Sequence, residues 1–520
     1  METTLNQPPS DVKVLQESLL EAQTLLAEKE DENTALQDKL NALIEQLRLA
    51  RHQRFASSSE KQNPAQGELF DEAEACVEET ESDEDETITV PAHQRKKCGR
   101  KPLPAHLPRI KVIHDLNEDE KICEHDGQPL HKIGEEISEQ LDIIPAKIQV
   151  IRNIRFKYAC RTCSEGVKTA TMPKQAIPKS NASAGLLAYI ATAKYQDALP
   201  LYRQENIFKR HDIEIPRATM ANWMIKIGGE LFTPLINLMR DHLISQPLIH
   251  YDETTYQVLK EPDKTAQSKS YMWVGASGPP GKRVILFDYA PTRAASVPVQ
   301  LLGGFSGYLV TDDYAGYNAV CKTEDITRVG CWAHARRKFY DALKIQKNKT
   351  GKAQVTINYI AKLYRIEKQI KELPSNERLQ VRQDESAKII DEMRIWLDKS
   401  IPQVPTSSKL GVALRYLNNN WSRLIEFLND AVIPLDNNLA ENAIRPFVIG
   451  RKNWLHSNSV KGAYASAAIY SIIETAKANN IEPYGYLKYI IDRLPLVDTV
   501  EQYEELLPWN VEKGFLTSWH

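Results

Sequence analysis

Long apolar runs are absent from this 520-residue chain: no stretch approaches the length of a membrane-spanning helix, and the first residues show no signal-peptide pattern. We therefore expect a cytoplasmic protein with no membrane partner. Cysteine is also scarce, with seven residues and a single C-x-x-C pair. An odd number of cysteines argues against a disulfide framework and favours a reducing compartment, where the paired cysteines would bind a metal.

A strong net charge is also lacking, since 66 Lys and Arg nearly balance 69 Asp and Glu. The balance hides a local asymmetry, because an acidic run at 78–86 precedes a basic run at 95–109. Charges act on a polyanion only within a Debye length, so the basic run can attract nucleic acid whatever the net charge. With 42% hydrophobic residues the chain can bury a sizeable core, and its length indicates several domains.

A heptad repeat near the start of the chain predicts a coiled coil. Its a positions are Val12, Leu19, Leu26, Asn33, Leu40 and Leu47, and its d positions are Leu15, Ala22, Lys29, Leu36, Leu43 and Ala50. A lone Asn at an a position satisfies itself across a parallel two-stranded seam and so favours a homodimer in one register. The alternative is a single amphipathic helix packed on its own chain.

The residues after the heptads have the composition of a disordered linker, because Ser, Gln, Glu and Asp predominate up to about residue 89. A basic segment follows, in which Arg100 and Lys101 precede a proline that favours extended backbone. Such a segment can lie along the minor groove of DNA. A solvated interdomain linker is the alternative.

A small zinc-binding β-unit is expected next. Cys160 and Cys163 form the C-x-x-C pair after an extended run, and Cys123 with His125, or less favourably Asp126, would complete a tetrahedral site. A bound metal would hold together a unit whose own core is thin. The alternative is a pair of thiols without a metal.

The pattern then becomes helical, with apolar residues three and four apart at 183–231. A short turn with Pro216 separates two predicted helices. This arrangement suits a helix-turn-helix whose second helix would offer Arg217 and Asn222 to DNA. An ordinary helical hairpin explains the pattern equally well.

Three acidic residues lie at predicted strand ends or on a predicted helix, where packing of the core does not explain a carboxylate. Asp252 follows apolar residues in IHYDETTYQVL, and Asp312 follows the apolar run GYLV. An unpaired carboxylate is costly inside a sheet, so each should face a cation. Glu441 belongs to a later predicted helix, which Asp436 or Asn437 can cap.

The pattern around these acids predicts a mixed α/β sheet. Strand-like runs follow one another between 248 and 291, and a further strand ends at Asp312. A polar, helical stretch at about 340–430 is expected as an insertion. Because neighbouring strand ends lie side by side in a sheet, Asp252 and Asp312 can converge, with the helix of Glu441 across the same edge.

Such a cluster suits two divalent cations, Mg²⁺ or Mn²⁺, and therefore phosphodiester chemistry. Basic residues that would hold the DNA backbone flank the acids, namely Arg336, Arg337, Lys338, Arg445, Arg451 and Lys452. Taken singly, each acid has a plainer explanation as a turn residue, a helix cap or an intrahelical partner of Arg445. The order strand-acid, strand-acid, helix-acid with basic flanks favours the metal site.

Along nearly its whole length the chain resembles the DDE transposases of the insertion sequence 66 family. The shared motifs are GRKPLPAHLPR, KYACRTC, LYRQENIF, RATMANW, HYDET, TDDYAGY, AHARRKF and, most specific of all, NNLAENAIRPFVIGRKNWL. The resemblance implies a ribonuclease H-like catalytic domain with Asp252, Asp312 and Glu441 as the metal-binding catalytic triad. Asp312 is preferred to Asp313 because it aligns with the motif and ends the strand.

The resemblance also implies an activity: binding the terminal inverted repeats of an insertion sequence, with metal-dependent cleavage and strand transfer. Mg²⁺ would bind the triad, and structural Zn²⁺ would bind Cys123, Cys160 and Cys163. The implied partners are inverted-repeat and target DNA at the nucleoid and further copies of the chain, and accessory proteins of the same element stay open. The alternatives are a DNA-binding repressor without catalysis and a structure-selective nuclease.

The expected organisation runs in order along the chain. The segments are a coiled coil at 11–51, a disordered linker with a basic segment at 52–110, a zinc-binding β-unit at 111–175, a helical DNA-binding region at 180–240, a catalytic domain at 245–480 and a helical tail at 481–520.

Overall fold

The computed structural model describes residues 12–55, 148–159, 167–323, 325–345 and 351–512. The chain divides into two compact units, one formed by 1–84 with 174–520 and the other by 85–173. In the smaller unit, β1 (Lys157–Ala159) and β2 (Val167–Thr169) form an antiparallel hairpin. Several predicted residues lie outside the described parts, namely Arg100, Lys101, Cys123, His125, Cys160 and Cys163.

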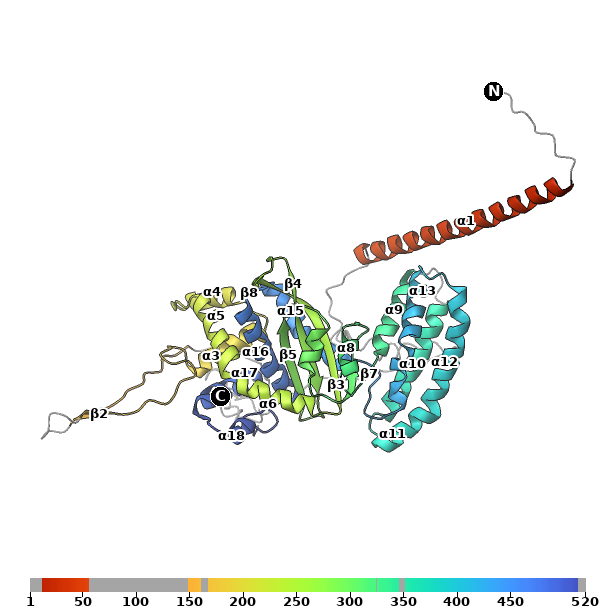
Figure 1. Cartoon of the computed structure of the whole chain (residues 1–520). Coiled ribbons are helices and arrows are strands. Elements are labelled where there is room, and N and C mark those ends of the chain that lie inside the picture. Colours follow the sequence, from red (N-terminus) through yellow and green to blue (C-terminus); the bar gives the residue numbers. More distant parts are fainter. Residues whose placement is uncertain (1–11, 56–147, 160–166, 324, 346–350, 513–520) are drawn as a thin grey trace, which may run out of the picture. The chain divides into compact units, whose positions relative to one another are not determined.

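One unbroken helix, α1 (Val12–Phe55), contains the predicted heptads (Figure 1). Its apolar stripe is solvent-exposed in the single chain, and Leu26 and Leu40 are 62% and 56% exposed. A long helix gains little stability from such leucines unless another helix covers them. Among the described residues, no helix is both long and apolar enough to cross a membrane.

Within the described residues of the larger unit, a six-stranded sheet forms the centre (Figure 1). Its strands are β3 (Leu248–Lys260), β4 (Lys269–Ser277), β5 (Val284–Ala290), β6 (Gly307–Val310), β7 (Ile326–Val329) and β8 (Ser457–Ser459). The order is β5-β4-β3-β6-β7, and β8 pairs with the far end of β3. Because β3, β4 and β5 are antiparallel while β6 and β7 join in parallel, the predicted mixed sheet is confirmed.

The register between β3 and β6 sets two of the acids at one level. His250 lies opposite Val310 in this parallel pair. Asp252 and Asp312 each follow two residues later, one on a strand that continues and the other just beyond a strand that has ended. The sheet therefore brings the two acids to the same edge.

Some helices precede the sheet in the sequence and others follow it, and both groups share one hydrophobic core with β3, β4 and β5. They are α3 (Ala184–Tyr195), α4 (Leu201–Lys209), α5 (Arg217–Lys226), α6 (Thr233–Ile244), α15 (Asn438–Trp454), α16 (Val460–Ala478), α17 (Pro483–Arg493) and α18 (Val500–Glu505). The region predicted to bind DNA and the predicted C-terminal tail therefore pack together with the sheet.

Helix α16 also covers the open edge of β5 with polar side chains. Ser471 and Thr475 accept hydrogen bonds from the main-chain N–H groups of Phe287 and Ile285, at 2.8 and 3.0 Å. Four residues of helix rise about 6 Å and two residues of strand about 6.6 Å, so successive turns meet successive free N–H groups. The edge strand is thereby closed to further pairing.

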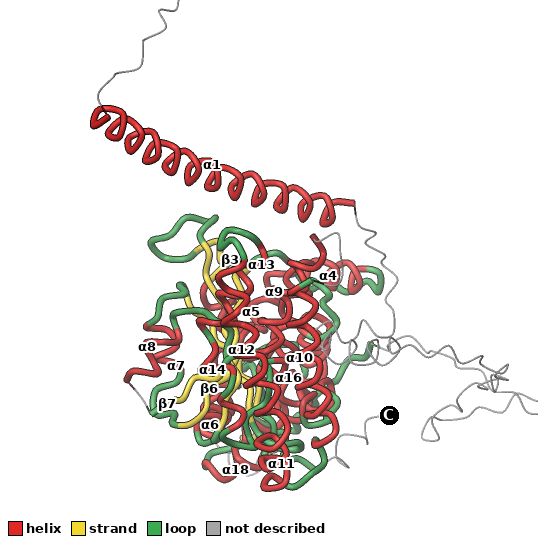
Figure 2. The backbone as a smooth tube through the Cα atoms, turned by 90° about the vertical axis from the view of Figure 1, so that its right-hand side faces the viewer, coloured by secondary structure: helices red, strands yellow, loops and turns green. Residues whose placement is uncertain are grey.

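A second hydrophobic core belongs to a helical bundle that follows β7, where the insertion was expected. Its helices are α9 (Trp332–Ile345), α10 (Lys352–Ile370), α11 (Ser375–Val381), α12 (Ala387–Ser400), α13 (Lys409–Asn419) and α14 (Trp421–Leu424). Val310 and Val329 belong to the same core, so the bundle rests on β6 and β7. Two short helices, α7 (Ser296–Leu301) and α8 (Tyr317–Thr323), lie beside these strands (Figure 2).

Candidate active site

The predicted acids gather where β3, β6 and α15 meet. Burial raises the pKa of Asp252 well above its usual value, and the nearby carboxylates of Glu253, Glu441 and Asp312 add to the increase. One oxygen of Asp252 accepts a hydrogen bond from the main-chain N–H of Glu253 at 2.8 Å. The three acids are therefore close enough to repel one another, which is the electrostatic setting that a divalent cation would relieve.

Asn437 connects the helix of Glu441 to the strand of Asp252. Its side-chain amide donates to the main-chain carbonyl of Tyr251 at 2.9 Å and lies 3.1 Å from His250 Nδ1. Although Asn437 is the residue before α15, its side chain does not cap the helix, as one reading of the sequence expected. It reaches across to β3 instead. Glu441 follows Asn437 by one helical turn, so this contact holds Glu441 near the strand of Asp252.

Asp312 and Asp313 have different surroundings. One oxygen of Asp312 accepts a hydrogen bond from the main-chain N–H of Tyr314 at 2.9 Å, and the other lies 4.0 Å from the guanidinium of Arg293. The side chain of Asp313 is 47% exposed and lies 3.6 Å from Arg423. Of the two, Asp312 is the one that acts electrostatically on Asp252.

Glu253 holds the guanidinium of Arg293 beside the acids, a role that was not predicted from the sequence. Its carboxylate, 1% exposed, accepts hydrogen bonds from Arg293 Nε at 2.7 Å and from the Tyr317 hydroxyl. The guanidinium of Arg293 stacks 3.7 Å from the ring centre of Tyr314 and faces Asp312. Arg293 is therefore fixed at the rim of the site with its charge toward the acids.

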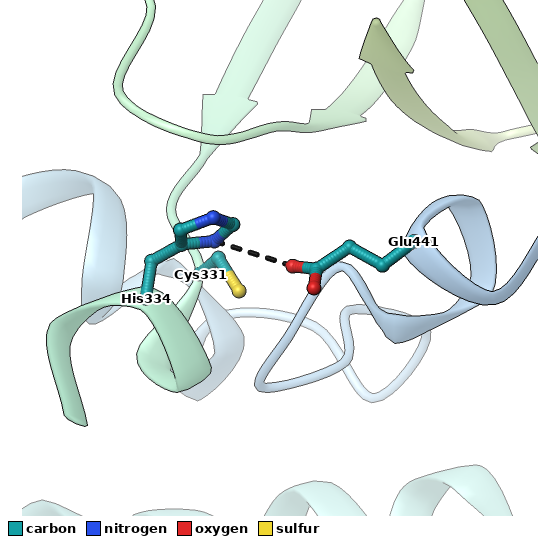
Figure 3. A group of neighbouring side chains, drawn as sticks. All are labelled: Cys331, His334 and Glu441. Atoms are coloured by element: carbon teal, nitrogen blue, oxygen red, sulfur yellow. Dashed lines mark ion pairs between the residues drawn. The ribbon is translucent and has the colours of Figure 1, made fainter. Parts of the chain in front are cut away.

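Glu441 faces two side chains of α9, one near each of its carboxylate oxygens. Its Oε1 lies 3.3 Å from His334 Nδ1, and its Oε2 lies 3.4 Å from Arg337. Figure 3 shows the imidazole directed at this carboxylate with Cys331 beside them. No role was predicted for Cys331 or His334, although their C-x-x-H spacing at the start of a helix was a signal that could have identified them.

The side chains around Glu441 form the tighter potential ligand set. Ligand atoms of Cys331, His334 and Glu441 all lie within 4.8 Å of one another. In the described part of the chain, Asp252, Asp312 and Glu441 do not form such a compact group. Glu441 thus stands between two sets of potential ligands.

The structure separates the basic residues predicted on α9. Arg336 is 3% exposed, with its guanidinium 5.7 Å from the ring centre of Tyr340, so it cannot present its charge to DNA from this position. Arg337 is 42% exposed and borders Glu441. The ammonium of Lys338 lies 4.5 Å from the ring centre of Tyr416. Arg336 is therefore buried, whereas Arg337 and Lys338 are partly exposed.

The basic residues of α15 differ in their exposure and contacts. Arg451 is half-buried and donates to the hydroxyls of Thr254 and Thr255 on β3, both at 3.3 Å. Lys452 is exposed, and Arg445 is half-buried. The guanidinium of Arg451 is thereby held against β3.

Helix α5 presents its predicted DNA-binding residues to solvent. Arg217 and Asn222 are exposed, while Met220, Trp223 and Met224 are buried on the other side of the helix. The helix before it, α4, contacts α5, as in a helix-turn-helix. Among the described residues, the Arg217 side of α5 is therefore exposed to solvent.

Comparison with known proteins decides the family. A model described as "Transposase IS66 family" matches residues 179–465, more than half of the chain. The chain belongs to the IS66 transposase family. Three further models match: the zinc-finger binding domain of transposase IS66 at 120–164, the "Transposase C of IS166 homeodomain" at 42–112 and the IS66 C-terminal element at 471–509. The resemblance inferred from the motifs is thereby confirmed.

Relatives of similar length occur in Sinorhizobium fredii (strain NBRC 101917 / NGR234). Protein y4hP is 30% identical over 511 residues, covering 92% of this chain and 89% of its own length. Protein y4jD is 32% identical, covering 78% of this chain and 81% of its own length, and y4qI is 32% identical, covering 85% and 82%. Family membership makes this protein a transposase with DNA as its partner, and the zinc-finger match supports the use of metal.

Proposed function

We propose that this IS66-family transposase cleaves and joins DNA at a divalent-metal site formed by Asp252, Asp312 and Glu441. The observation that carries the proposal is the convergence of the three acids: the register of β3 and β6 sets Asp252 and Asp312 at one level, and Asn437 ties the start of the Glu441 helix to β3. Carboxylates that lie close together repel one another and lower the stability of the folded protein. Clusters of this kind are therefore typical of functional sites. Their hard oxygen atoms fit Mg²⁺ or Mn²⁺.

The topology supports a ribonuclease H-like catalytic domain. Numbered along the chain from β3, the strands stand in the order 3-2-1-4-5, with the first three antiparallel and the last two parallel. Asp252 lies on the first of these strands and Asp312 just after the fourth, its parallel neighbour. The helical bundle stands between the fifth strand and the helix that carries Glu441.

In this proposal the cations, when bound, activate the attacking oxygen and stabilise the leaving oxygen. The attacking group is water for cleavage and a DNA 3′ hydroxyl for joining, so no covalent protein–DNA intermediate is required. Asn437 holds Glu441 near Asp252, and Arg293 faces the phosphate. Basic side chains of α9 and α15, namely Arg337, Lys338, Arg445, Arg451 and Lys452, would bind the DNA backbone.

The N-terminal half would supply recognition and assembly. We assign Arg100 and Lys101 with the exposed face of α5 to the terminal inverted repeats, and α1 to a parallel coiled coil between two copies of the chain. A structural Zn²⁺ would be held by Cys123, His125, Cys160 and Cys163.

A joining assay tests the proposal. The purified protein is mixed with oligonucleotides that copy the inverted repeats flanking its gene, a plasmid target and Mg²⁺, beside Asp252→Asn and the matched control Asp313→Asn. We expect joined products from the native protein and from Asp313→Asn, and none from Asp252→Asn or with a chelator. Specific binding without products would favour a repressor, and cutting without joining would favour a nuclease.

A further inference from the structure

A second set of metal ligands lies beside the proposed triad. Cys331 Sγ, His334 Nδ1 and a Glu441 carboxylate oxygen lie within 4.8 Å of one another (Figure 3). In a tetrahedral zinc site, with bonds of about 2.0 to 2.3 Å, the ligand atoms stand roughly 3.4 to 3.6 Å apart. The 3.3 Å between His334 and Glu441 already matches such an edge, so only the sulfur has to approach.

Two of these atoms are buried without a hydrogen bond. His334 Nδ1 and Glu441 Oε1 face each other, and neither has a hydrogen-bond partner among the residues that the structure describes. In its neutral form an imidazole can bind a metal through such a nitrogen. Buried polar atoms are nearly always satisfied, and an ion between these two would satisfy both.

The scaffold holds the set in place. Trp332, next to Cys331, is fully buried, and its indole N–H donates to the Leu424 carbonyl at 2.8 Å. The main-chain N–H of Asn437 donates to Cys331 Sγ at 3.3 Å, a bond that would stabilise a thiolate. The ligands therefore stand on rigid elements, as a metal site requires.

The charges suit a zinc-type ion. A thiolate, a carboxylate and a neutral imidazole around a divalent ion form a neutral group, which a buried site tolerates better than separate charges. Binding displaces the thiol proton of Cys331 to solvent. Sulfur and imidazole ligands favour Zn²⁺ or Co²⁺ over Mg²⁺, so the two sites would differ in selectivity.

We propose that Cys331, His334 and Glu441 bind one zinc-type ion, and that an ion held there keeps Glu441 from acting with Asp252 and Asp312. The second half of this statement rests on the proposed function, because it assumes that Glu441 belongs to the catalytic triad. Excess zinc would then inhibit the transposase by capturing one of its own acids.

Cobalt binding to the full chain tests the site itself. Co²⁺ per chain and the thiolate-to-cobalt absorption are measured for the native protein, for Cys331→Ser and for Cys321→Ser, which replaces a half-buried cysteine of α8 outside the set. Cysteines of the zinc-finger region are also expected to bind cobalt, so the difference in bound Co²⁺ between the proteins is the signal. We expect the native protein and Cys321→Ser to bind one more Co²⁺ per chain than Cys331→Ser.

His334→Asn provides a second variant, and circular dichroism shows which variants are folded. Folded His334→Asn should also bind one Co²⁺ fewer than the native protein. Equal binding by the native protein and by a folded variant of either ligand would overturn the proposal.

Inhibition is measured in the joining assay as the ratio of rates with and without Zn²⁺ at constant Mg²⁺. We expect a fall of at least tenfold for the native protein and a ratio near one for Cys331→Ser. An equal fall in both would overturn the inhibitory role. If no protein joins DNA, the proposed function fails, and cobalt binding still decides whether the site exists.

Discussion

The side-chain amide of Asn437 donates a hydrogen bond to the main-chain carbonyl of Tyr251 across 2.9 Å, next to Asp252 on the same strand. Asn437→Ala would leave that carbonyl and the imidazole of His250 buried without this partner. We expect a loss of about 1 to 3 kcal/mol in the free energy of unfolding, measured in urea. Joining should fall by more than the unfolded fraction explains, because Glu441 loses its anchor.

The control for this change is Asn429→Ala, which removes an exposed hydrogen bond to Glu426. Its effect on stability should stay within about 0.5 kcal/mol. Equal losses for the two variants would show that Asn437 has no special part in joining α15 to β3.

Asp252→Asn should stabilise the metal-free protein at neutral pH. The pKa of Asp252 is raised in the folded protein, so ionisation lowers stability from about pH 4, the unfolded value, and the loss is complete above the folded pKa. We expect the variant to be about 1 to 2 kcal/mol more stable at pH 7.5 without metal and equal to the native protein near pH 3.

Added Mg²⁺ should reverse this order. The ion binds only the folded native site and so raises its melting temperature, whereas Asp252→Asn should respond much less. Thermal melts over a Mg²⁺ series measure both effects. If the melting temperature of the native protein did not change with Mg²⁺ or Mn²⁺, the proposed metal site would be contradicted.

The hydrogen bonds between α16 and the edge of β5 should contribute measurably to the free energy of unfolding. Thr475→Val keeps the shape of the side chain but removes the hydroxyl that accepts from Ile285 N–H and donates to the Ile285 carbonyl. We expect a loss of about 1 to 3 kcal/mol, because buried main-chain groups are left unpaired. Thr192→Val is the matched control, since that hydroxyl has no hydrogen-bond partner and its removal should be neutral or stabilising.

The pair formed by Arg293 and Glu253 should show coupling in a double-mutant cycle. Arg293→Gln leaves the buried Glu253 carboxylate without its main partner, and we expect a loss of about 1 to 3 kcal/mol in urea unfolding. Adding Glu253→Gln should recover part of that loss, since no charge is then buried alone. Strictly additive losses would mean that the two side chains do not depend on each other.

The apolar stripe of α1 predicts how the protein assembles. Leu26 occupies an a position of the heptads, whereas Leu20 lies off the seam, and the two are 62% and 64% exposed in the single chain. We expect Leu26→Lys to shift sedimentation toward monomer and Leu20→Lys to leave it unchanged. A monomeric native protein, or equal effects of both changes, would contradict the coiled coil.

Several features could be predicted from the sequence because they depend on local period and strand order. Heptad spacing predicts α1, and apolar runs ending in Asp252 and Asp312 predict strands whose acids share one edge. The burial of Arg336 also follows from local period. Trp332, Ala335 and Phe339 form the buried stripe of α9, and Arg336 lies one turn after Trp332 on that side.

The sequence by itself determined the family and the mixed sheet, because motifs, periodicity and strand order depend on residues that are neighbours in the chain. Only the tertiary structure decided what surrounds Glu441. His334 and Arg337 reach it from a helix more than a hundred positions earlier, with the bundle between them in sequence. Such contacts depend on how α9 and α15 pack against the sheet, and no local pattern encodes that packing.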